Sequence, residues 1–443
     1  MRDQMNPDRS GTLWSAALFA AVIGSAFVLL CPASVLAIAG ETEGVFGIDG
    51  RLSTLVWISD YSDLPSFVKN KDEAYSLQTG LRLMAGGRLR DRLSYEVHVV
   101  ESFNLTSSAA QEFYPESGGS RYQALDVLWK QYDAGDARAC LALDRFSIKF
   151  SFPHADLTVG RQAITFGKAY FWNPLDVFLP FAAEQIDRDY KSGVDAIRLD
   201  IPIGSFSGMN VIGVFGREIT PEGDFANQDK TWDSSWFGSA ALLRLYTNIA
   251  DWDLSLQGGK IYGGYQIGSG VAGEVGPLAL RFEAAHFTAE GKRAPMPFPF
   301  QGQLLEDHWT AVLGMGHYFE NTFDFELECL YNGAGDPDNL EASLVRFNYG
   351  STLHLGKHLL GLMMSYDIIP ILKARLAWIY SFSDQSSYIQ PVLTLSLSDE
   401  AELLFGAAIG VGSRPYLDGI TPRLASEFGS YPNFYFIELK YYF

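Results

Sequence analysis

The stretch FDFELE, residues 323–328, places an apolar side chain at every odd position and a carboxylate at every even position. Alternation with a period of two is typical of a β-strand whose two faces meet different surroundings. The same alternation recurs in residues 45–58, 75–85 and 93–99, and beyond residue 40 no segment shows a convincing helical period over three turns. The chain is therefore predicted to be all-β, with strands that have one apolar face and one charged face.

Two all-β architectures produce such strands: a soluble sandwich or barrel with its apolar face inside, and a membrane barrel with its apolar face outside. Aromatic residues at the strand ends and connections that are alternately short and long favour the membrane barrel. The predicted short connections are residues 88–92, 153–156, 320–322, 367–370 and 398–400, and the predicted long ones are 104–139, 165–192, 217–235, 290–308 and 412–432.

The strand count follows from the same alternation. With both ends of the barrel domain on the periplasmic side, the number of strands must be even. We predict a transmembrane antiparallel β-barrel of about 18 strands with short periplasmic turns and long external loops, or about 16 if the weakest segments are not strands. The predicted strands are residues 45–58, 74–87, 92–103, 140–152, 156–164, 193–202, 208–216, 236–248, 252–262, 265–275, 278–289, 309–319, 323–332, 352–367, 371–382, 387–397, 400–411 and 433–443.

Composition excludes several classes of protein. The chain has 443 residues and a formal net charge of -19, which argues against a protein that tracks nucleic-acid phosphates. Three cysteines exclude a disulfide scaffold, and without a haem-attachment motif or paired zinc ligands in the sequence no cofactor or metal is expected. A single long apolar run, near the N-terminus, excludes a helical protein with several membrane spans.

Residues 1–39 are predicted to be a secretory signal peptide. Arg2 and Arg9 precede the apolar run, and Ala37 and Ala39 form the small-residue pattern of a cleavage site. Residues 40–443 would then form a single barrel domain, located in the outer membrane of a Gram-negative bacterium. A retained membrane anchor is the alternative, because the apolar run is long enough to span a bilayer.

The segment 435–443 also alternates, and it ends in an aromatic residue. It resembles the terminal strand of bacterial outer-membrane proteins, which implies recognition by the barrel-assembly machinery. An ordinary edge strand is the alternative interpretation. The residues of this predicted assembly signal are Tyr435, Ile437, Leu439, Tyr441 and Phe443.

A second resemblance covers residues 159–198, which contain VGRQ (159–162), FG (166–167), NPLD (173–176) and GVDAIR (193–198). This segment resembles the strand–loop–strand region of proteobacterial porins related to the alginate-export family. The resemblance implies a barrel of about 18 strands that serves as a diffusion or export channel for polar solutes. Alginate exporters line their pore with many arginines, and this sequence departs from that pattern.

The polar faces of the predicted strands supply candidate lumen residues. Cations and anions are about equal in number on these faces, so alginate, a polyanion, is not favoured as the solute. Many of the charges are expected to form cross-strand ion pairs that stiffen the wall. The predicted lumen-lining residues are Arg51, Arg82, Glu96, Arg198, Asp200, Arg244, Arg281, Glu283, Asp324, Glu326, Glu328, Lys373 and Arg375.

The third external loop, residues 165–192, is the candidate functional site. It is rich in aromatic side chains, which favour burial over exposure to water. We predict that this loop folds into the barrel mouth and narrows the pore, with its charged residues setting the local field. The alternative is that the rings pack onto neighbouring external loops as a structural cover. The predicted constriction residues are Asp176, Glu184, Asp187, Arg188 and Asp189.

The predicted function is a porin-like channel for passive diffusion or export of small polar or anionic solutes, surrounded by outer-membrane lipid and lipopolysaccharide. No catalytic step is expected, because Asp307 and His308 at an external rim are a lone pair without a G-x-S-x-G motif. Two alternatives belong to other classes: a barrel that sheathes a partner such as an electron-transfer cytochrome, and an outer-membrane enzyme.

Overall fold

The structure is a computed structural model that describes residues 46–107, 121–218, 234–291, 296 and 302–443. The predicted signal peptide lies outside the described residues. The main strands are β1 (Gly47–Asp60), β2 (Glu73–Arg90), β3 (Leu93–Thr106), β5 (Ala137–Phe152), β6 (Ala155–Gln162), β7 (Val194–Ile203), β8 (Ser207–Val214), β9 (Ala240–Ile249), β10 (Trp252–Ile261), β11 (Gly264–Val275), β12 (Leu278–Ala289), β13 (His308–Tyr318), β14 (Asp324–Asn332), β15 (His358–Ile369), β16 (Leu372–Ser381), β17 (Ser386–Ser398), β18 (Ala401–Val411) and β21 (Asn433–Tyr442). The other elements are β4 (Leu128–Ala134), α3 (Leu340–Asn348), β19 (Tyr416–Asp418), β20 (Thr421–Arg423) and the short helix η2 (Phe428–Ser430).

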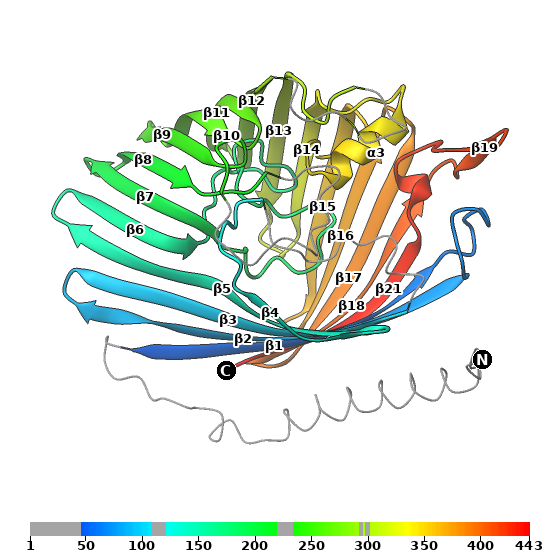
Figure 1. Ribbon diagram of the computed structural model, residues 1–443, viewed down its shortest axis with the longest axis horizontal. Coiled ribbons are helices and arrows are strands. Elements are labelled where there is room, and N and C mark those ends of the chain that lie inside the picture. The colour runs from blue at the N-terminus through cyan, green and yellow to red at the C-terminus, as the bar shows by residue number, and fades with distance from the viewer. Residues whose placement is uncertain (1–45, 108–120, 219–233, 292–295, 297–301) are drawn as a thin grey trace.

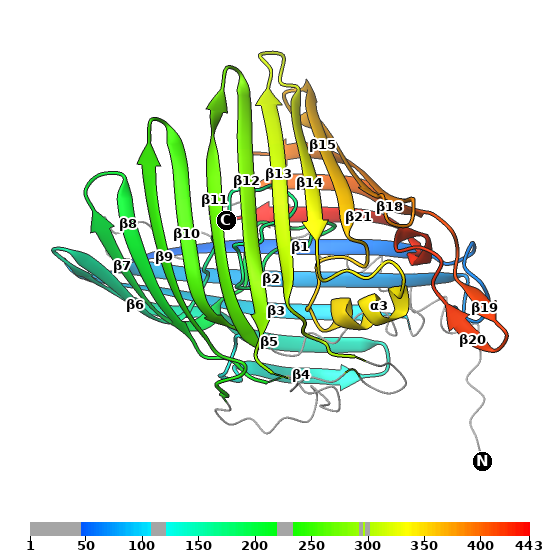
Figure 2. The same cartoon turned by 90° about the horizontal axis from the view of Figure 1, so that it is seen from above.

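Eighteen antiparallel strands form a closed barrel (Figures 1 and 2). Each main strand pairs with the next one along the chain, and β1 pairs with both β2 and β21, so the first and last strands close the ring. Strand β4 lengthens the sheet beside β5 at the barrel rim. The predicted fold class and strand count are confirmed.

The two faces of the wall differ as the FDFELE stretch predicts. In β14, Glu328 and Leu330 are buried towards the lumen, whereas Cys329 and Tyr331 are exposed on the outside. Large apolar side chains are exposed around the outer wall, among them Phe150, Ile267, Phe282, Trp309 and Leu313. An apolar band of this extent needs a non-aqueous surrounding, so the outer wall suits the hydrocarbon core of a bilayer.

Short turns join the strands at one end of the barrel, and most connections at the other end are longer (Figure 1). The backbone N–H of Gly50 donates to the carbonyl of Phe443 at 2.6 Å, so the start of β1 and the end of β21 meet at the turn end. The segment 163–193, between β6 and β7, is the third connection at the loop end, as predicted.

Three details of the wall and loops differ from the prediction. Strand β4 lies within the predicted loop 104–139, and the hairpin β19–β20 lies within 412–432. Strand β15 begins at His358 rather than at residue 352, because helix α3 and an irregular segment precede it. The Asn339 side chain caps α3 by accepting the N–H of Ala342. No helix among the described residues is long and apolar enough to cross a membrane.

Candidate functional site

The segment 163–193, hereafter the inner loop, lies inside the barrel. It contacts inward-facing side chains on opposite parts of the wall. Glu328 on β14 accepts backbone N–H groups of the loop, Arg51 on β1 pairs with Asp187 at 2.6 Å, and Gln390 on β17 donates to the carbonyl of Glu184 at 3.1 Å. Because these strands surround the lumen, the loop crosses it.

Two buried wall carboxylates hold the first half of the inner loop. Glu328 accepts the N–H groups of Tyr170, Phe171 and Trp172, the second at 2.8 Å and the third at 3.4 Å. Glu283 on β12 accepts N–H groups of the loop in the same way, from Lys168 and Leu175. Both glutamates point inward from the wall, but the loop covers them, so their role here is to satisfy loop donors that burial would otherwise leave without partners.

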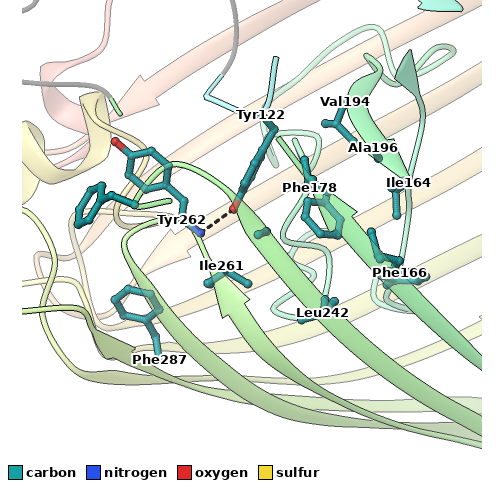
Figure 3. Close-up of a cluster of buried hydrophobic side chains, with 14 residues drawn as sticks. Tyr122, Ile164, Phe166, Phe178, Val194, Ala196, Leu242, Ile261, Tyr262 and Phe287 are labelled. Atoms are coloured by element: carbon teal, nitrogen blue, oxygen red, sulfur yellow. Dashed lines mark hydrogen bonds between the residues drawn. The ribbon is translucent and has the colours of Figure 1, made fainter. Parts of the chain in front are cut away.

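Aromatic rings of the loop are buried against the wall in two clusters. Phe166 and Phe178 pack with Leu242 of β9 and with Tyr122, whose hydroxyl accepts the N–H of Tyr262 at 3.0 Å (Figure 3). The second cluster joins the inner loop to strands β13 to β18. Its buried members are Phe171, Trp172, Ala183, Val312, Leu330, Leu359, Met363, Ala377, Ile379, Tyr388, Ala408 and Phe428.

Inward-facing glycines make room for the loop. A Cβ on Gly361 of β15 would lie 2.7 Å from the ring of Phe171 and 2.9 Å from that of Trp172. A Cβ on Gly268 of β11 would lie 2.6 Å from the side chain of Leu175. Such distances are shorter than van der Waals contact, so a side chain at either position would displace the loop.

The acidic pair Asp187 and Asp189 ties the loop to the seam where the barrel closes. Arg51 on β1 lies 2.6 Å from Asp187 and 3.3 Å from Asp189. Lys440 on β21 lies 3.3 Å and 2.9 Å from the same two carboxylates, and the Tyr442 hydroxyl donates to Asp189 at 2.8 Å. The negative charge of this pair is therefore met by cations of the first and last strands.

Asp176 and Lys191 form a buried ion pair within the loop. Lys191 Nζ lies 2.6 Å from both oxygens of Asp176 and also donates to the carbonyl of Ile164 at 2.7 Å. Burial raises the pKa of Asp176 to about 6, although Lys191 acts in the opposite direction. Burial likewise lowers the pKa of Lys191. Desolvation thus outweighs the attraction in this pair, which joins distant parts of the loop.

Glu184 and Arg188, the other two predicted constriction residues, lie near the second ring cluster. Arg188 donates to the carbonyls of Tyr170, Ala182 and Ala183, and it forms no ion pair with a described residue. Burial lowers the pKa of Arg188 and raises that of Glu184. Whether the five predicted residues set the field of a constriction stays a prediction.

The predicted lumen residues all occupy inward-facing positions, and most of their charges are paired within the wall. The pairs between wall strands include Arg82 with Asp144 (2.6 Å), Arg145 with Glu96 (3.0 Å), Lys149 with Asp156 (2.7 Å) and Lys373 with Asp367 (3.7 Å). Arg198 and Asp200 form a pair within β7 at 2.8 Å. Asp324, Arg244 and Arg375 form no ion pair in the described part of the chain. The charges of the paired residues are largely compensated within the wall, without any solute.

One pair reaches over a strand. Arg281 on β12 binds Glu326 on β14 at 2.8 Å, and β13 lies between them. Gly316 of β13 allows this contact, because a Cβ there would lie 2.2 Å from Glu326.

Sequence reasoning missed three charged members of the site: Asp144, Lys168 and Lys191. Asp144 turns inward because the register between β3 and β5 shifts at this point, a bulge that strict alternation does not reveal. Lys168 pairs with Asp253 on β10 at 3.0 Å. The two lysines lie in the loop, where no face pattern exists to follow.

A cavity of about 420 Å³ lies between the inner loop and the segments near the external rim. Its lining is mostly apolar and includes the rings of Trp172, Tyr262 and Phe287. Arg121, Glu184 and His308 are among its few charged or titratable members. Apolar walls with a few polar groups are typical of a small-molecule site.

The residues of the predicted assembly signal lie on β21 and at its end. Tyr435 and Ile437 are exposed on the outer wall, and Tyr441 shares their face. Recognition by the assembly machinery stays a prediction.

No protein-family model and no curated protein matches the chain. In fold it is similar to OccAB4 of Acinetobacter baumannii, with 10% identity, a TM-score of 0.53 and coverage of 91% of this chain and 99% of that chain. It is similar to a BenF-like porin of Pseudomonas fluorescens (10% identity, TM-score 0.53, 90% and 100% covered). It is also similar to OpdK of Pseudomonas aeruginosa, solved with vanillate (9% identity, TM-score 0.51, 90% and 100% covered). These likenesses show the fold: a porin-like β-barrel.

Proposed function

We propose that the protein is an outer-membrane porin-like channel for passive diffusion of small polar, chiefly anionic, solutes. The observation that carries this proposal is a closed barrel with an apolar outer wall and a charged lumen that the inner loop crosses. Outer-membrane lipid and lipopolysaccharide surround the apolar band, and the barrel-assembly machinery inserts the chain by its terminal strand.

Three arginines supply the preference for anions. Arg188, Arg244 and Arg375 form no ion pair with a described residue. Most lumen carboxylates are compensated, either by a cation or, as in Glu328, by backbone N–H groups. These three uncompensated cations are the groups that would attract anions along the solute path, although the whole chain is acidic.

The inner loop sets the size limit of the channel. Asp176, Glu184, Asp187, Arg188 and Asp189 shape the constriction mainly by fixing the position of the loop, since several of them are paired or hydrogen-bonded. A loop across the lumen leaves little space for a partner protein, so the sheath alternative is not favoured. No catalytic step is proposed.

The relation to the alginate-export porin group rests on the segment 159–198 alone. A lumen whose arginines are mostly paired does not favour a long polyanion such as alginate. Small carboxylated solutes suit the unpaired arginines better, and vanillate, which is bound in the OpdK structure, is a suitable probe.

Liposome swelling tests the proposal. Liposomes that contain the purified protein should swell in solutions of small anionic solutes such as vanillate, faster than in cations of the same size. Protein-free liposomes are the control. Swelling no faster than in this control would contradict the proposed function.

A further inference from the structure

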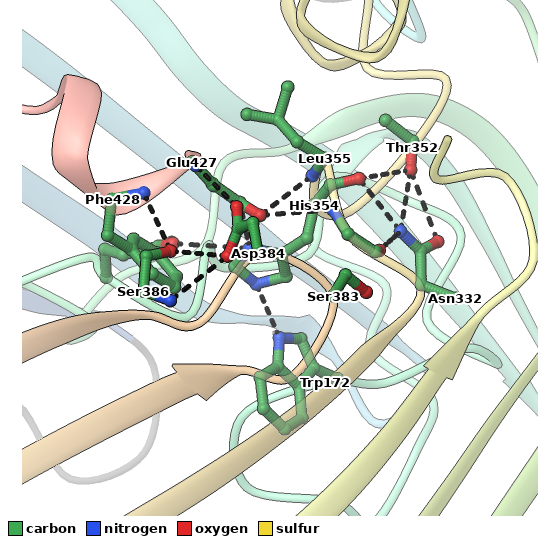
Figure 4. Close-up of polar contacts among 12 residues, drawn as sticks. Trp172, Asn332, Thr352, His354, Leu355, Ser383, Asp384, Ser386, Glu427 and Phe428 are labelled. Atoms are coloured by element: carbon green, nitrogen blue, oxygen red, sulfur yellow. Dashed lines mark hydrogen bonds and ion pairs between the residues drawn. The ribbon is translucent and has the colours of Figure 1, made fainter. Parts of the chain in front are cut away.

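His354 holds the inner loop in place through a hydrogen bond to the indole ring of Trp172. This histidine lies between α3 and β15, and its Nε2 is 2.9 Å from Nε1 of Trp172 (Figure 4). An indole N–H can only donate a hydrogen bond, so Nε2 must accept. His354 is therefore the neutral tautomer with its proton on Nδ1, which donates to Glu427 Oε1 at 2.7 Å.

The surroundings fix this orientation. The second oxygen of Glu427 accepts the N–H groups of Leu355 and Gly356 at 3.1 and 3.2 Å, and the N–H of Glu427 donates to Asp384 at 2.6 Å. His354 and Glu427 are both fully buried. The imidazole cannot turn over without breaking the hydrogen bonds to Trp172 and Glu427.

Three carboxylates nevertheless favour a charged imidazole. Glu427 is in direct contact, Glu184 Oε1 lies 3.8 Å from Nδ1, and Asp384 lies just beyond, whereas Arg188 adds a cation near Glu184. Burial by itself lowers the pKa of His354, but Glu427 and Glu184 outweigh it, so the pKa lies above its ordinary value. The carboxylates thus favour the charged imidazole, whereas the indole N–H of Trp172 requires the neutral one.

We propose that His354 is a positioning residue that acts as a proton-operated latch: a proton taken up at Nε2 removes the acceptor of Trp172 and releases the indole from the wall. Trp172 borders the cavity of about 420 Å³, which is the open space available to a released ring. Glu184 lines the same cavity, and its Oε1 has no hydrogen-bond partner among the described residues, so it offers the indole a new acceptor. The inference rests on the proposed channel function, because the released ring would narrow the solute path in acid.

Single-channel conductance of the full chain between pH 5 and 8 tests the latch. On acidification the unsubstituted protein should lose conductance about twofold or more, over a one-proton transition that spans about two pH units. His354→Gln should give a flat profile, because a glutamine amide can accept from Trp172 and donate to Glu427 without taking up a proton. Trp172→Phe should also be flat, because it has no donor to lose. His154→Gln, in a turn at the opposite end of the barrel, should keep the transition. A transition that survives in His354→Gln would overturn the proposal.

A second readout does not depend on conduction. In protein labelled with 5-fluorotryptophan, the fluorine resonance missing from Trp172→Phe belongs to Trp172. That resonance should shift with pH, and the shift should vanish in His354→Gln. If the unsubstituted protein carries no current at any pH, the channel function fails, while the fluorine titration still decides the latch: a Trp172 resonance that ignores pH refutes it.

Discussion

Glu328, an inward-facing carboxylate of β14, accepts the backbone N–H of Phe171 at 2.8 Å and so fastens the inner loop to the barrel wall. The adjacent N–H groups of Tyr170 and Trp172 point to the same carboxylate. A glutamate that alternation alone assigns to the solute path is thus a structural anchor. The position of the loop, and with it the size of the proposed channel, depends on this contact.

Replacing this anchor should free the loop. Each hydrogen bond to a charged group contributes about 1.5–3 kcal/mol, so Glu328→Ala should lower the free energy of unfolding by about 3 kcal/mol or more. Single-channel recordings should show higher conductance and more current noise than the unsubstituted protein. Glu402→Ala is the matched control, because Glu402 faces the same lumen on β18 and makes no hydrogen bond among the described residues. Equal recordings from the two variants would argue against the anchor.

A large side chain in place of an inward-facing glycine of the wall should push the inner loop away from the wall. Gly361→Leu places its side chain against Phe171 and Trp172, and overpacking of this kind costs about 1–3 kcal/mol. Gly213→Leu, where a Cβ meets no atom within 4 Å, is the control. The heat-dependent gel shift measures the difference: Gly361→Leu should unfold at a lower temperature, and Gly213→Leu at that of the unsubstituted protein.

The buried pair of Asp176 and Lys191 should make stability depend on pH. Because the pKa of Asp176 is raised from 3.8 to about 6, the folded state binds this proton more tightly than the unfolded chain. The stabilisation is complete below pH 3.8 and is lost as the pH rises through about 6. Two pKa units correspond to about 3 kcal/mol.

Urea unfolding at pH 4.5 and 7.5 measures this contribution. The double variant Asp176→Asn with Lys191→Met should lose that part of the pH dependence. Lys191→Met alone should be less stable at pH 7.5 than the double variant, because it leaves a buried carboxylate without its partner. A double variant with an unchanged pH dependence would show that the pair does not titrate as described.

Removing the unpaired arginines should reduce the preference for anions. Arg244→Gln and Arg375→Gln each delete an uncompensated charge and should move the reversal potential towards that of a cation-preferring channel. Lys149→Gln is the control, since Lys149 is paired with Asp156 at 2.7 Å. The arginines would have no role in selectivity if all three variants shifted the potential equally.

The barrel could be predicted from the sequence because a period of two is a local property that each strand carries by itself. The FDFELE stretch has the orientation that its pattern predicts, with Glu326 and Glu328 inside. The aromatic composition of residues 165–192 allowed the loop to be predicted inside the barrel mouth, as one of two alternatives. Inward-facing glycines such as Gly361 and Gly268 are a signal that the sequence prediction did not use, although they mark where the wall leaves room for the loop.

The partners of the loop could not be predicted. Glu328 and Trp172 are far apart in the sequence, and their contact depends on strand register and on the path of the loop together. The predicted strand 352–367 includes His354, yet the strand begins only at His358. The inward orientation of Asp144 could not be predicted either, because it depends on the bulge between β3 and β5.

The reversal potential in a planar bilayer under a salt gradient tests the central claim most directly. The account predicts stepwise conductance from the purified, folded protein and a reversal potential of the sign expected for anion preference. A folded barrel, shown by its heat-dependent gel shift, that produced no conductance steps would contradict the claim that this protein is a passive channel.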